Sequence, residues 1–348
     1  MNIYFFQWPS ELGGADTRLK DLIKLFGSKK QFKVKVIPND DSRLKEQENV
    51  DFILKNNGQC LSWNDLDKKL EGVAISCCNF RLFTDEWRLK RIKDSGLKFI
   101  WMNDMTVRMA EKELEALTKK LIDVNLYTTK FHKSQLDLED KKLNLIFRNK
   151  FYFIPNYFDS NSYKYFEREK KDTFTIGKHS RPDWRKFSND FPAFYENLNL
   201  KNPRFKIMGV GKDFQTRFSW YNFDPRWSIL SPNEEKTQDF LNSLDLYVYN
   251  SHNSFIENQS RAIVEAGLCG LPIIAPNKYY FPEQILHGET GFVYESYDDC
   301  KKYAQELENN FKLRLEFGKK SHSYLKDIYC DASKQLKLWE RVFSEIYF

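Results

Sequence analysis

Residues 245–276 read DLYVYNSHNSFIENQSRAIVEAGLCGLPIIAP and contain a complete strand–helix–strand unit. The apolar run DLYVYNS begins the stretch, and the apolar run LPIIAP ends it. Between them, SRAIVEAGLCG has the amphipathic spacing of a helix and is closed by a glycine. Two parallel strands need a crossover connection, which is usually a helix. The stretch therefore predicts one unit of a parallel α/β sheet.

The same alternation extends through the first half of the chain. The apolar runs that predict strands are NIYFFQW (2–8), FKVKVIP (32–38), VAISCCN (73–79), LKFIWMN (97–103), VNLYTTK (124–130) and FYFIPN (151–156). Helices are predicted between several of these runs, and the helical spacing is clearest in TVRMAEKELEALTKKLI (106–122). The polar and charged segment 157–172 interrupts the pattern and predicts a linker.

A second strand–helix series follows this linker. Its predicted strands are TFTIGKHS (173–180), FKIMGVG (205–211), WSILSP (227–232), DLYVYNS, LPIIAP and GFVYE (291–295), and the tail is almost entirely helical. The predicted fold class is α/β, with two Rossmann-like doubly wound domains that face each other across a cleft. We expect the domains at residues 1–160 and 173–325, with a C-terminal helix at 326–348 that packs back on the first domain. Ligands of such folds bind at the carboxyl ends of the strands, here in the cleft.

Composition narrows the class of protein. The 348 residues include 41% hydrophobic and 30% charged residues, which is typical of a globular chain and not of a disordered one. The net charge of +6 is a mild excess that suits an anionic ligand without being a nucleic-acid signature. No apolar run is long enough to predict a membrane span, and the first residues lack the pattern of a signal peptide. The six cysteines form no CxxC pair, so we predict no metal site, reduced thiols and a cytoplasmic location.

Two glycine-containing turns follow predicted strands. Gly13 and Gly14 precede the first predicted helix, where they would let a ligand approach the backbone, or simply form a tight turn. Gly209 and Gly211 form a GxG after the FKIM strand, which by itself is weak evidence for a phosphate loop. We favour a turn that lines the cleft.

A basic segment, TIGKHSRPDWRKF (175–187), opens the second domain. Four cations follow the strand that ends near Gly177, namely Lys178, Arg181, Arg185 and Lys186. Cations at the carboxyl end of a strand in a cleft suit a diphosphate. A solvated basic loop is the alternative that the residues alone leave open.

Two glutamates bracket the helix of the opening stretch. Glu257 lies at or just before the helix N-terminus, and Glu265 follows eight residues later. Since a helix has ~3.6 residues per turn, the two carboxylates lie on neighbouring faces and could border one extended ligand. Carboxylates accept hydrogen bonds from vicinal hydroxyls, and the helix N-terminus between them favours a negative group. An ordinary helix with one acid near its start is the alternative.

A polar pair, Asn103 and Asp104, ends the strand at 97–103. Asp at this place is an ordinary N-cap of the following helix. Because the pair lies at another strand carboxyl end, a role facing the cleft is the alternative.

In this order, the motifs resemble those of the GT-B-fold glycosyltransferases, specifically the large retaining family 4 (glycosyl transferases group 1). The motifs are Gly13-Gly14, DVNLYTTKFHKSQL (123–136), FIPNYFD (153–159), IGKHSR…RK, IMGVG, DLYVYNS, Glu257-x7-Glu265, AGLCGLPIIAP and HGETGFVYE (287–295). The resemblance covers most of the chain and is strongest over 245–295. It implies an acceptor-side first domain and a second domain that binds a nucleotide-sugar.

The resemblance also implies roles for individual residues. Glu257 would contact hydroxyls of the donor sugar, Glu265 would hold the ribose, and Lys186 would bind the diphosphate together with Arg181 or Lys178. The catalytic set is Glu257, Lys186, Arg181 and Asp104, and the donor-binding set is Gly13, Gly14, Gly177, Lys178, Gly209, Asn258, Gln259, Ser260 and Glu265. Ser260 stands where the family usually has glycine. Asp104 or Asn103 stands where many members have histidine.

The expected activity is transfer of a sugar from a nucleotide-diphosphate sugar to an acceptor hydroxyl with retention, without a metal or other cofactor. A glycan or lipid-linked glycan is the expected acceptor, and peripheral contact with a membrane stays open. One alternative is a phage-type transferase that modifies DNA bases. An alternative of another class is a non-catalytic module that binds nucleotide-sugars, and a second enzyme class is a sugar-nucleotide epimerase of the same fold.

Overall fold

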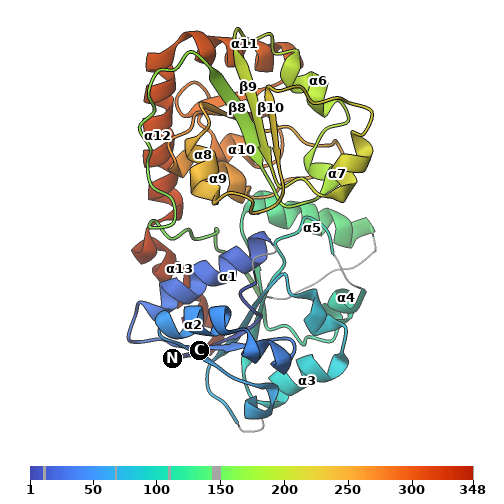
Figure 1. Cartoon of the computed structure of the whole chain (residues 1–348). Coiled ribbons are helices and arrows are strands. Elements are labelled where there is room, and N and C mark those ends of the chain that lie inside the picture. Colours follow the sequence, from blue (N-terminus) through green and yellow to red (C-terminus); the bar gives the residue numbers. More distant parts are fainter. Residues whose placement is uncertain (11–12, 67–68, 109–110, 143–149, 348) are drawn as a thin grey trace. The chain divides into compact units, whose positions relative to one another are not determined.

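In the computed structural model shown in Figure 1, the described residues are 1–10, 13–66, 69–108, 111–142 and 150–347. They form two compact units. The first consists of Met1–Asp159 with Asp331–Phe348, and the second of Ser160–Cys330. Each unit contains one parallel sheet with helices, so the predicted α/β class with two doubly wound sheets is confirmed.

The sheet of the first unit has seven strands in the order β3-β2-β1-β4-β5-β6-β7. They are β1 (Asn2–Phe6), β2 (Lys33–Ile37), β3 (Gly58–Cys60), β4 (Val73–Cys77), β5 (Lys98–Met102), β6 (Val124–Tyr127) and β7 (Lys150–Phe153). In the register, Phe5 of β1 lies opposite Val36 of β2 on one side and Ile75 of β4 on the other. The strand order therefore reverses between β1 and β4.

The helices of the first unit are α1 (Gly14–Gly27), α2 (Gln47–Lys55), α3 (Glu86–Asp94), α4 (Glu111–Thr118), α5 (Lys130–Lys142) and α13 (Ala332–Tyr347), with the 3-10 turns η1 (Asp41–Lys45), η2 (Trp63–Leu66) and η3 (Phe80–Phe83). Helix α4 is shorter than the pattern at 106–122 predicts. It ends before Lys120, whose φ of 54° is left-handed. Met109 and Ala110 lie outside the described residues.

The C-terminal helix α13 belongs to the core of the first unit. Leu336, Trp339, Val342 and Phe343 are buried in the same cluster as β1 and α1. The rings of Trp339 and Phe26 lie edge to face with centroids 5.4 Å apart, a favourable geometry for aromatic pairs. Residues 326–329 are the end of a preceding helix that lies in the second unit.

The sheet of the second unit has six strands in the order β10-β9-β8-β11-β12-β13. The strands are β8 (Phe174–His179), β9 (Pro203–Met208), β10 (Trp227–Leu230), β11 (Leu246–Val248), β12 (Ile273–Pro276) and β13 (Gly291–Tyr294). All neighbouring strands are parallel, and β8 lies at the centre between β9 and β11. The carboxyl ends of β8 and β11 are therefore neighbours where the strand order reverses, which is where such sheets bind ligands.

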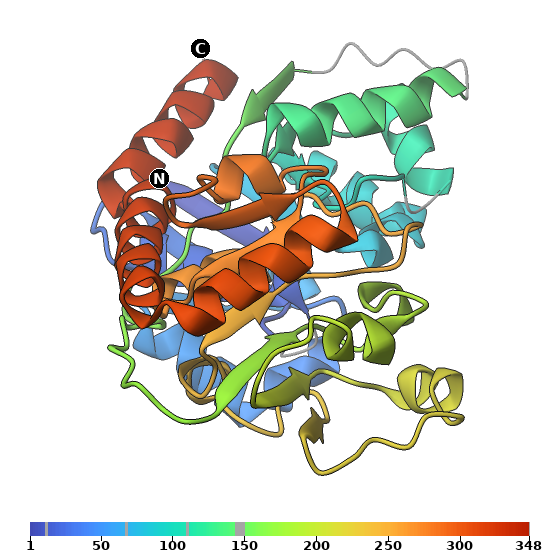
Figure 2. The same cartoon turned by 90° about the horizontal axis from the view of Figure 1, so that it is seen from above.

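The helices of the second unit are α6 (Phe191–Glu196), α7 (Lys212–Arg217), α8 (Thr237–Asn242), α9 (Arg261–Leu268), α10 (Phe281–Gln284), α11 (Tyr297–Asn309) and α12 (Phe311–Tyr329), with the 3-10 turn η4 (Trp184–Lys186). Helix α11 packs against β12 and β13 and lies nearest the viewer in Figure 2. Among the described residues, none of the helices combines the length and apolar character needed to cross a membrane.

The polar segment predicted as a linker is fixed to the second unit by Arg168, which is only 7% exposed. Its guanidinium donates hydrogen bonds to the carbonyls of Leu241, Leu244, Cys269 and Gly270. Burial lowers the pKa of Arg168 to about 10, so the group stays charged at neutral pH. Arg168 therefore links residues 160–172 to the carbonyl groups at the C-terminal ends of α8 and α9.

Candidate active site

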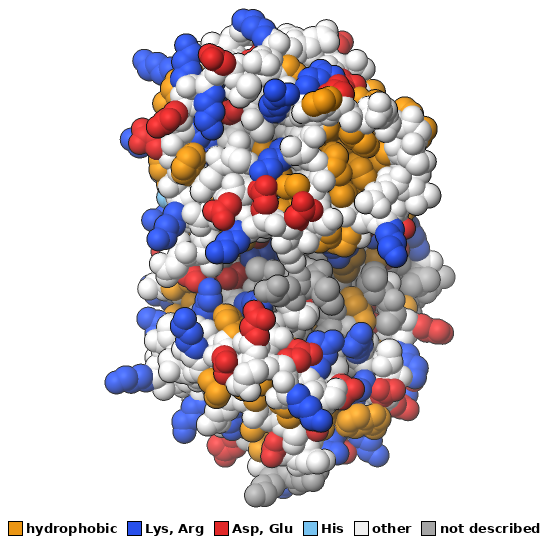
Figure 3. All heavy atoms as spheres, in the orientation of Figure 1, with side chains coloured by type: hydrophobic (Ala, Val, Ile, Leu, Met, Phe, Trp, Pro, Cys, Tyr) orange, Lys and Arg blue, Asp and Glu red, His pale blue; other side chains and the backbone are white. Residues whose placement is uncertain are grey.

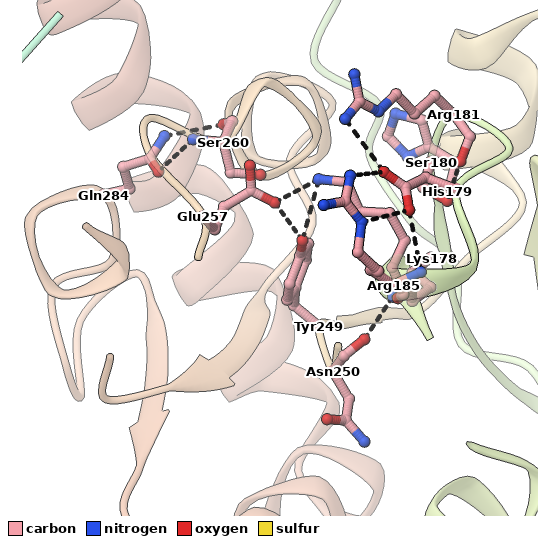
Figure 4. Close-up of polar contacts among 12 residues, drawn as sticks. Lys178, His179, Ser180, Arg181, Arg185, Tyr249, Asn250, Glu257, Ser260 and Gln284 are labelled. Carbon is pink, nitrogen blue, oxygen red and sulfur yellow. Dashed lines mark hydrogen bonds and ion pairs between the residues drawn. The ribbon is translucent and has the colours of Figure 1, made fainter. Parts of the chain in front are cut away.

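The carboxyl ends of β8 and β11 carry a cluster of three polar side chains, Lys186, Tyr249 and Glu257. Nζ of Lys186 lies 2.6 Å from Oε2 of Glu257 and 3.4 Å from the Tyr249 hydroxyl. The Tyr249 hydroxyl donates to the same carboxylate oxygen, as Figure 4 shows. Lys186 ends η4, Tyr249 follows β11, and Glu257 lies in the loop before α9. The fold thus joins three segments that are distant in sequence.

Burial governs the charges of this cluster. The pKa of Lys186 is lowered mainly by burial, against the opposing effect of Glu257. The pKa of Tyr249 is raised well above its ordinary value by burial and by the negative charge of Glu257. Tyr249 therefore stays protonated and acts as a donor at neutral pH. The ring of Phe255 lies 4.0 Å from Nζ of Lys186 and adds a cation–π contact.

Lys178 is fully buried, and its ammonium group is directed at the main chain. It donates hydrogen bonds to the carbonyls of Lys186 and Asn250, the latter at 2.5 Å. The rings of Phe187 and Tyr249 lie 4.9 and 4.7 Å from Nζ. Burial, followed by the charge of Lys186, lowers the pKa of Lys178 well below its ordinary value. Lys178 therefore ties the loop after β8 to the end of β11.

Arg181 and Arg185 share one carboxylate, Asp183 (Figure 4). Arg181 Nη2 and Arg185 Nη2 lie 3.1 and 2.8 Å from the same oxygen of Asp183. Burial would raise the pKa of Asp183, but hydrogen bonds from Arg185 and both positive charges bring it down to about 2. Both arginine side chains are 39% exposed. Of the two residues considered as the second cation for a diphosphate, Arg181 is thus the one that reaches solvent.

The second glutamate, Glu265 of α9, pairs with His179 at the end of β8. His179 Nε2 lies 2.8 Å from Glu265 Oε2, and Arg261 Nε lies 3.6 Å from Oε1. Burial alone would raise the pKa of Glu265, but the hydrogen bond and charge of His179, together with Arg261, lower it. Glu265 is therefore an anion held in a fixed direction.

His179 and Tyr249 are two further site residues that were not identified from the sequence. Each contacts one of the two glutamates. Each also stands at the carboxyl end of one of the two strands between which the strand order reverses. That position was the available signal, because side chains at such ends meet at one edge of the sheet.

The residues between the glutamates form the entrance to α9. Ser260 is its N-cap with φ of −74°, a conformation that needs no glycine. The side-chain amide of Gln284 accepts from the Ser260 N–H at 3.0 Å and donates to the Ser260 carbonyl at 2.9 Å. Asn258 and Gln259 are buried, and Gln259 is hydrogen bonded to the Tyr329 hydroxyl. This explains how serine is accommodated where the family usually has glycine.

Gly177 and Gly209 are explained by close backbone packing. A Cβ at Gly177 would lie 1.8 Å from the carbonyl oxygen of Lys206 on β9. Gly209 has φ of +97°, and a Cβ there would lie 1.7 Å from the carbonyl oxygen of Ser180. Both glycines bring β9 and the loop after it against β8. They shape the edge of the site through the backbone.

Residues 196–323 match the family described as glycosyl transferases group 1. The match contains Glu257, Glu265 and α9, whereas β8 and the basic loop after it precede the matched residues. The resemblance read from the motifs is confirmed.

Solved structures extend this likeness over the whole GT-B fold. Alr3699/HepE of Anabaena, solved with UDP and glucose, superposes with a TM-score of 0.73, covering 99% of this chain and 100% of that one at 13% identity. Sucrose-phosphate synthase of Thermosynechococcus elongatus has a TM-score of 0.71 with the same coverage at 12% identity. A glycosyltransferase of Rickettsia africae has a TM-score of 0.73, covering 99% and 98% at 13% identity. At these identities the likeness shows the fold. No curated protein matches the sequence.

The remaining predicted residues lie in the first unit. Gly13 is an extended residue before α1, its carbonyl accepts from the Thr17 N–H, and Gly14 begins the helix. Glu11 and Leu12, of the same stretch, lie outside the described residues. These glycines are therefore placed at the N-terminus of α1, beside the end of β1.

Asn103 and Asp104 follow β5, and neither has the N-cap role suggested above. Asp104 forms an ion pair with the buried Arg18, and its N–H donates to Cys78 Sγ at 2.9 Å. Asn103 accepts from the Met105 N–H and donates to Glu113. The described part of the next helix, α4, begins at Glu111, well beyond both residues.

Proposed function

We propose that the protein transfers a sugar from a nucleoside-diphosphate sugar to an acceptor hydroxyl, with retention at the anomeric carbon. The observation that carries the proposal is the pairing of Lys186 with Glu257 at the switch point of the second sheet. It places a cation and a carboxylate side by side where such sheets bind nucleotides. The similar HepE structures contain UDP with glucose, or UDP-glucose, which supports a donor of this class.

Each site residue would bind a different part of the nucleotide-sugar donor. An ammonium group has three donors, and Lys186 gives two of them to Glu257 and Tyr249. The third would donate to a phosphate oxygen, with the half-exposed Arg181 as the second cation. Glu257 would accept from the sugar hydroxyls through its remaining lone pairs. Glu265, held by His179, would accept from the ribose hydroxyls.

The difficult step is departure of the nucleoside diphosphate, which gains charge in the transition state. Lys186, Arg181 and the N-terminus of α9 would stabilise that charge, so we propose that the reaction needs no metal or other cofactor. Glu257 is hydrogen bonded to Lys186, and Glu265 is hydrogen bonded to His179. These hydrogen bonds lower the nucleophilicity of both carboxylates. We therefore propose front-face transfer, in which the leaving phosphate accepts the proton of the attacking hydroxyl.

For the acceptor, we propose a glycan or a lipid-linked glycan on the cytoplasmic side, as the family resemblance suggests. The test begins with a thermal-shift panel of nucleotide-sugars, where a donor at 100 times its Kd should stabilise by ~2.7 kcal/mol. Hits are then assayed for release of nucleoside diphosphate and for transfer, with the anomeric configuration read by NMR.

Variants sharpen this test. Glu257→Gln should abolish turnover, whereas Glu316→Gln, which alters a surface glutamate paired with Lys320, should not. Binding without turnover would favour the non-catalytic module, and an inverted product would overturn retention. Transfer to duplex DNA in preference to glycans would favour the phage-type alternative. No stabilisation by any nucleotide-sugar would contradict the proposal as a whole.

A further inference from the structure

Tyr249 is an almost completely buried residue whose hydroxyl reaches the candidate site. Figure 3 shows hydrophobic side chains, in orange, gathered on the surface of the second unit where Figure 1 places α7. Tyr249 is not part of that surface, because it is only 1% exposed. Its hydroxyl contacts Glu257 and Lys186, the carboxylate and the cation on which the proposed function depends. Any effect of Tyr249 on ligand binding is therefore exerted through these two charged groups.

The packing around Tyr249 fixes the position of its hydroxyl. The Tyr249 N–H donates to the Ile274 carbonyl at 2.8 Å, which ties the backbone to β12. The ring packs against Phe281, with centroids 4.8 Å apart, and against the ammonium group of Lys178 at 4.7 Å. The Tyr294 hydroxyl donates to the Tyr249 carbonyl at 3.4 Å. A side chain held in this way is preorganised, so little entropy is lost when a ligand binds beside it.

Together, Tyr249 and Lys186 occupy one oxygen of Glu257. Both donate to Oε2, which has about two lone-pair positions. The other oxygen, Oε1, accepts no hydrogen bond from any residue that the structure describes. Figure 4 shows this second oxygen directed away from both donors. Because the side chain is 12% exposed and Oε1 is not among the buried polar atoms without a partner, Oε1 is the oxygen that a ligand can reach.

The occupied oxygen limits how Glu257 binds a sugar. A free carboxylate accepts one hydroxyl on each oxygen and so holds two vicinal hydroxyls. With Oε2 occupied, only Oε1 is left for a ligand, and the two donors at Oε2 set its direction. Tyr249 suits this arrangement because its one proton goes to Glu257, while its oxygen lies 3.4 Å from Nζ of Lys186. Phenylalanine would keep the ring and lose both contacts.

We propose that Tyr249 is a positioning residue that directs Oε1 of Glu257 at a single hydroxyl of the donor sugar. The proposal rests on the proposed function, because that function assigns Glu257 to the sugar of a nucleotide-sugar. It adds a rule of specificity, since Glu257 then discriminates donor sugars by one hydroxyl and not by a vicinal pair. Binding of the nucleoside diphosphate alone does not use this contact.

The test compares a nucleotide-sugar with its nucleoside diphosphate by isothermal titration calorimetry on the full chain. UDP-glucose and UDP are the first pair, because similar HepE structures contain them. If another nucleotide-sugar gives the largest thermal shift in the panel described above, it and its diphosphate replace them. Tyr249→Phe should weaken binding of the nucleotide-sugar about tenfold, which corresponds to about 1.4 kcal/mol. The Kd of the diphosphate should change less than about twofold.

Tyr195→Phe is the matched control. Tyr195 is fully buried, and its hydroxyl donates to the backbone carbonyl of Val248 at 2.6 Å. The substitution therefore removes a buried hydroxyl from the same unit without removing a contact to Glu257. Both Kd values should stay within about twofold of the wild type. Unchanged binding of the diphosphate also shows that each variant is folded.

Donors that lack one hydroxyl of the sugar identify the contact. For the donor without the hydroxyl that Oε1 accepts, the wild type and Tyr249→Phe should bind with the same Kd. Donors that keep this hydroxyl should show the full loss of about tenfold in the variant. Two positions that are each coupled to the substitution would overturn the single-hydroxyl contact. The same loss for every deoxy donor would overturn the positioning role.

Other results would also overturn the proposal. Loss of both ligands in Tyr249→Phe, or equal effects of Tyr249→Phe and Tyr195→Phe, would assign Tyr249 to the stability of the fold. Normal binding of both ligands by Tyr249→Phe would contradict its role alone and leave the proposed function standing. If the wild type bound neither a nucleotide-sugar nor a nucleoside diphosphate, the proposed function would fail, and the role of Tyr249 with it.

Discussion

Lys186 and Glu257 are 71 positions apart in the chain, yet they form a 2.6 Å ion pair. Their side chains are only 13% and 12% exposed. The two residues were expected to bind different parts of one ligand, the diphosphate and the sugar. In this structure they bind each other, so any loss of one partner leaves a largely buried charge unpaired.

The first prediction concerns this pair. Lys186→Met or Glu257→Gln should lower the free energy of unfolding by about 3–5 kcal/mol, the usual cost of an uncompensated buried charge. The double variant should recover most of this loss, because no unpaired charge is left. Turnover should fall at least about 100-fold in all three variants, since the charges act on the leaving group. Urea unfolding and donor turnover measure the two effects, and additive losses of stability would contradict the pairing.

The second prediction separates two roles for Lys178. If Lys178 ties the loop after β8 to β11, Lys178→Met leaves two buried carbonyls unpaired and costs about 1–3 kcal/mol for each. Stability should then fall together with donor affinity. A ligand of the diphosphate alone would raise KM and leave the midpoint of unfolding unchanged, which is the outcome that would refute the structural role. Arg181→Gln is the comparison, since Arg181 is half-exposed and its loss should affect KM far more than stability.

The third prediction concerns Glu265. Glu265→Gln weakens hydrogen bonds to the ribose by removing the charge, which is worth about 1.5–3 kcal/mol, or roughly 10–150-fold in KM. The effect on kcat should be much smaller, because the ribose is remote from the reacting carbon. A deoxyribose donor should show little further loss in the variant. A wild-type KM in Glu265→Gln would remove Glu265 from the donor site.

The fourth prediction is a pH dependence that originates in the first unit. Burial lowers the pKa of His132 to about 3, and the neutral ring bonds the Met105 carbonyl and the Thr128 N–H. Between pH ~6.5 and 3 the unfolded chain binds a proton that the folded chain does not. This residue therefore destabilises the fold as pH falls, by up to about 1.4 kcal/mol per unit. His132→Gln should show a shallower loss of unfolding free energy from pH 7 to pH 5, and parallel curves would contradict the assignment.

The fifth prediction concerns Ser260. Because its φ of −74° suits any residue and its backbone is held by Gln284, Ser260→Gly should cost only a few tenths of a kcal/mol. Donor turnover should stay within about twofold of the wild type. Gln284→Leu should be far more damaging, because it leaves the Ser260 N–H and carbonyl without their buried partner. Equal effects of the two variants would show that the serine hydroxyl, not the amide clamp, supports the site.

The sequence by itself determined the local elements and their class. Runs such as DLYVYNS and LPIIAP are short and rich in apolar residues, which favours buried strands, and the helical spacing between them favours parallel pairing. It also placed Glu257, Glu265 and the basic segment next to strand ends. These features depend on residues that are close in the sequence, so a sequence pattern can predict them.

Tertiary structure alone decided which charged groups meet. The pattern could not show that Lys178 is directed at two backbone carbonyls, or that Arg181 and Arg185 share Asp183. Nor could it show that His179 and Tyr249 would contact the two glutamates, since these contacts span 86 and 8 positions and depend on the strand order. A lysine in a basic segment gives the same sequence pattern whether its side chain is buried or solvated. Only the packing of β8 against β11 removes water from one ammonium group and leaves a nearby guanidinium exposed.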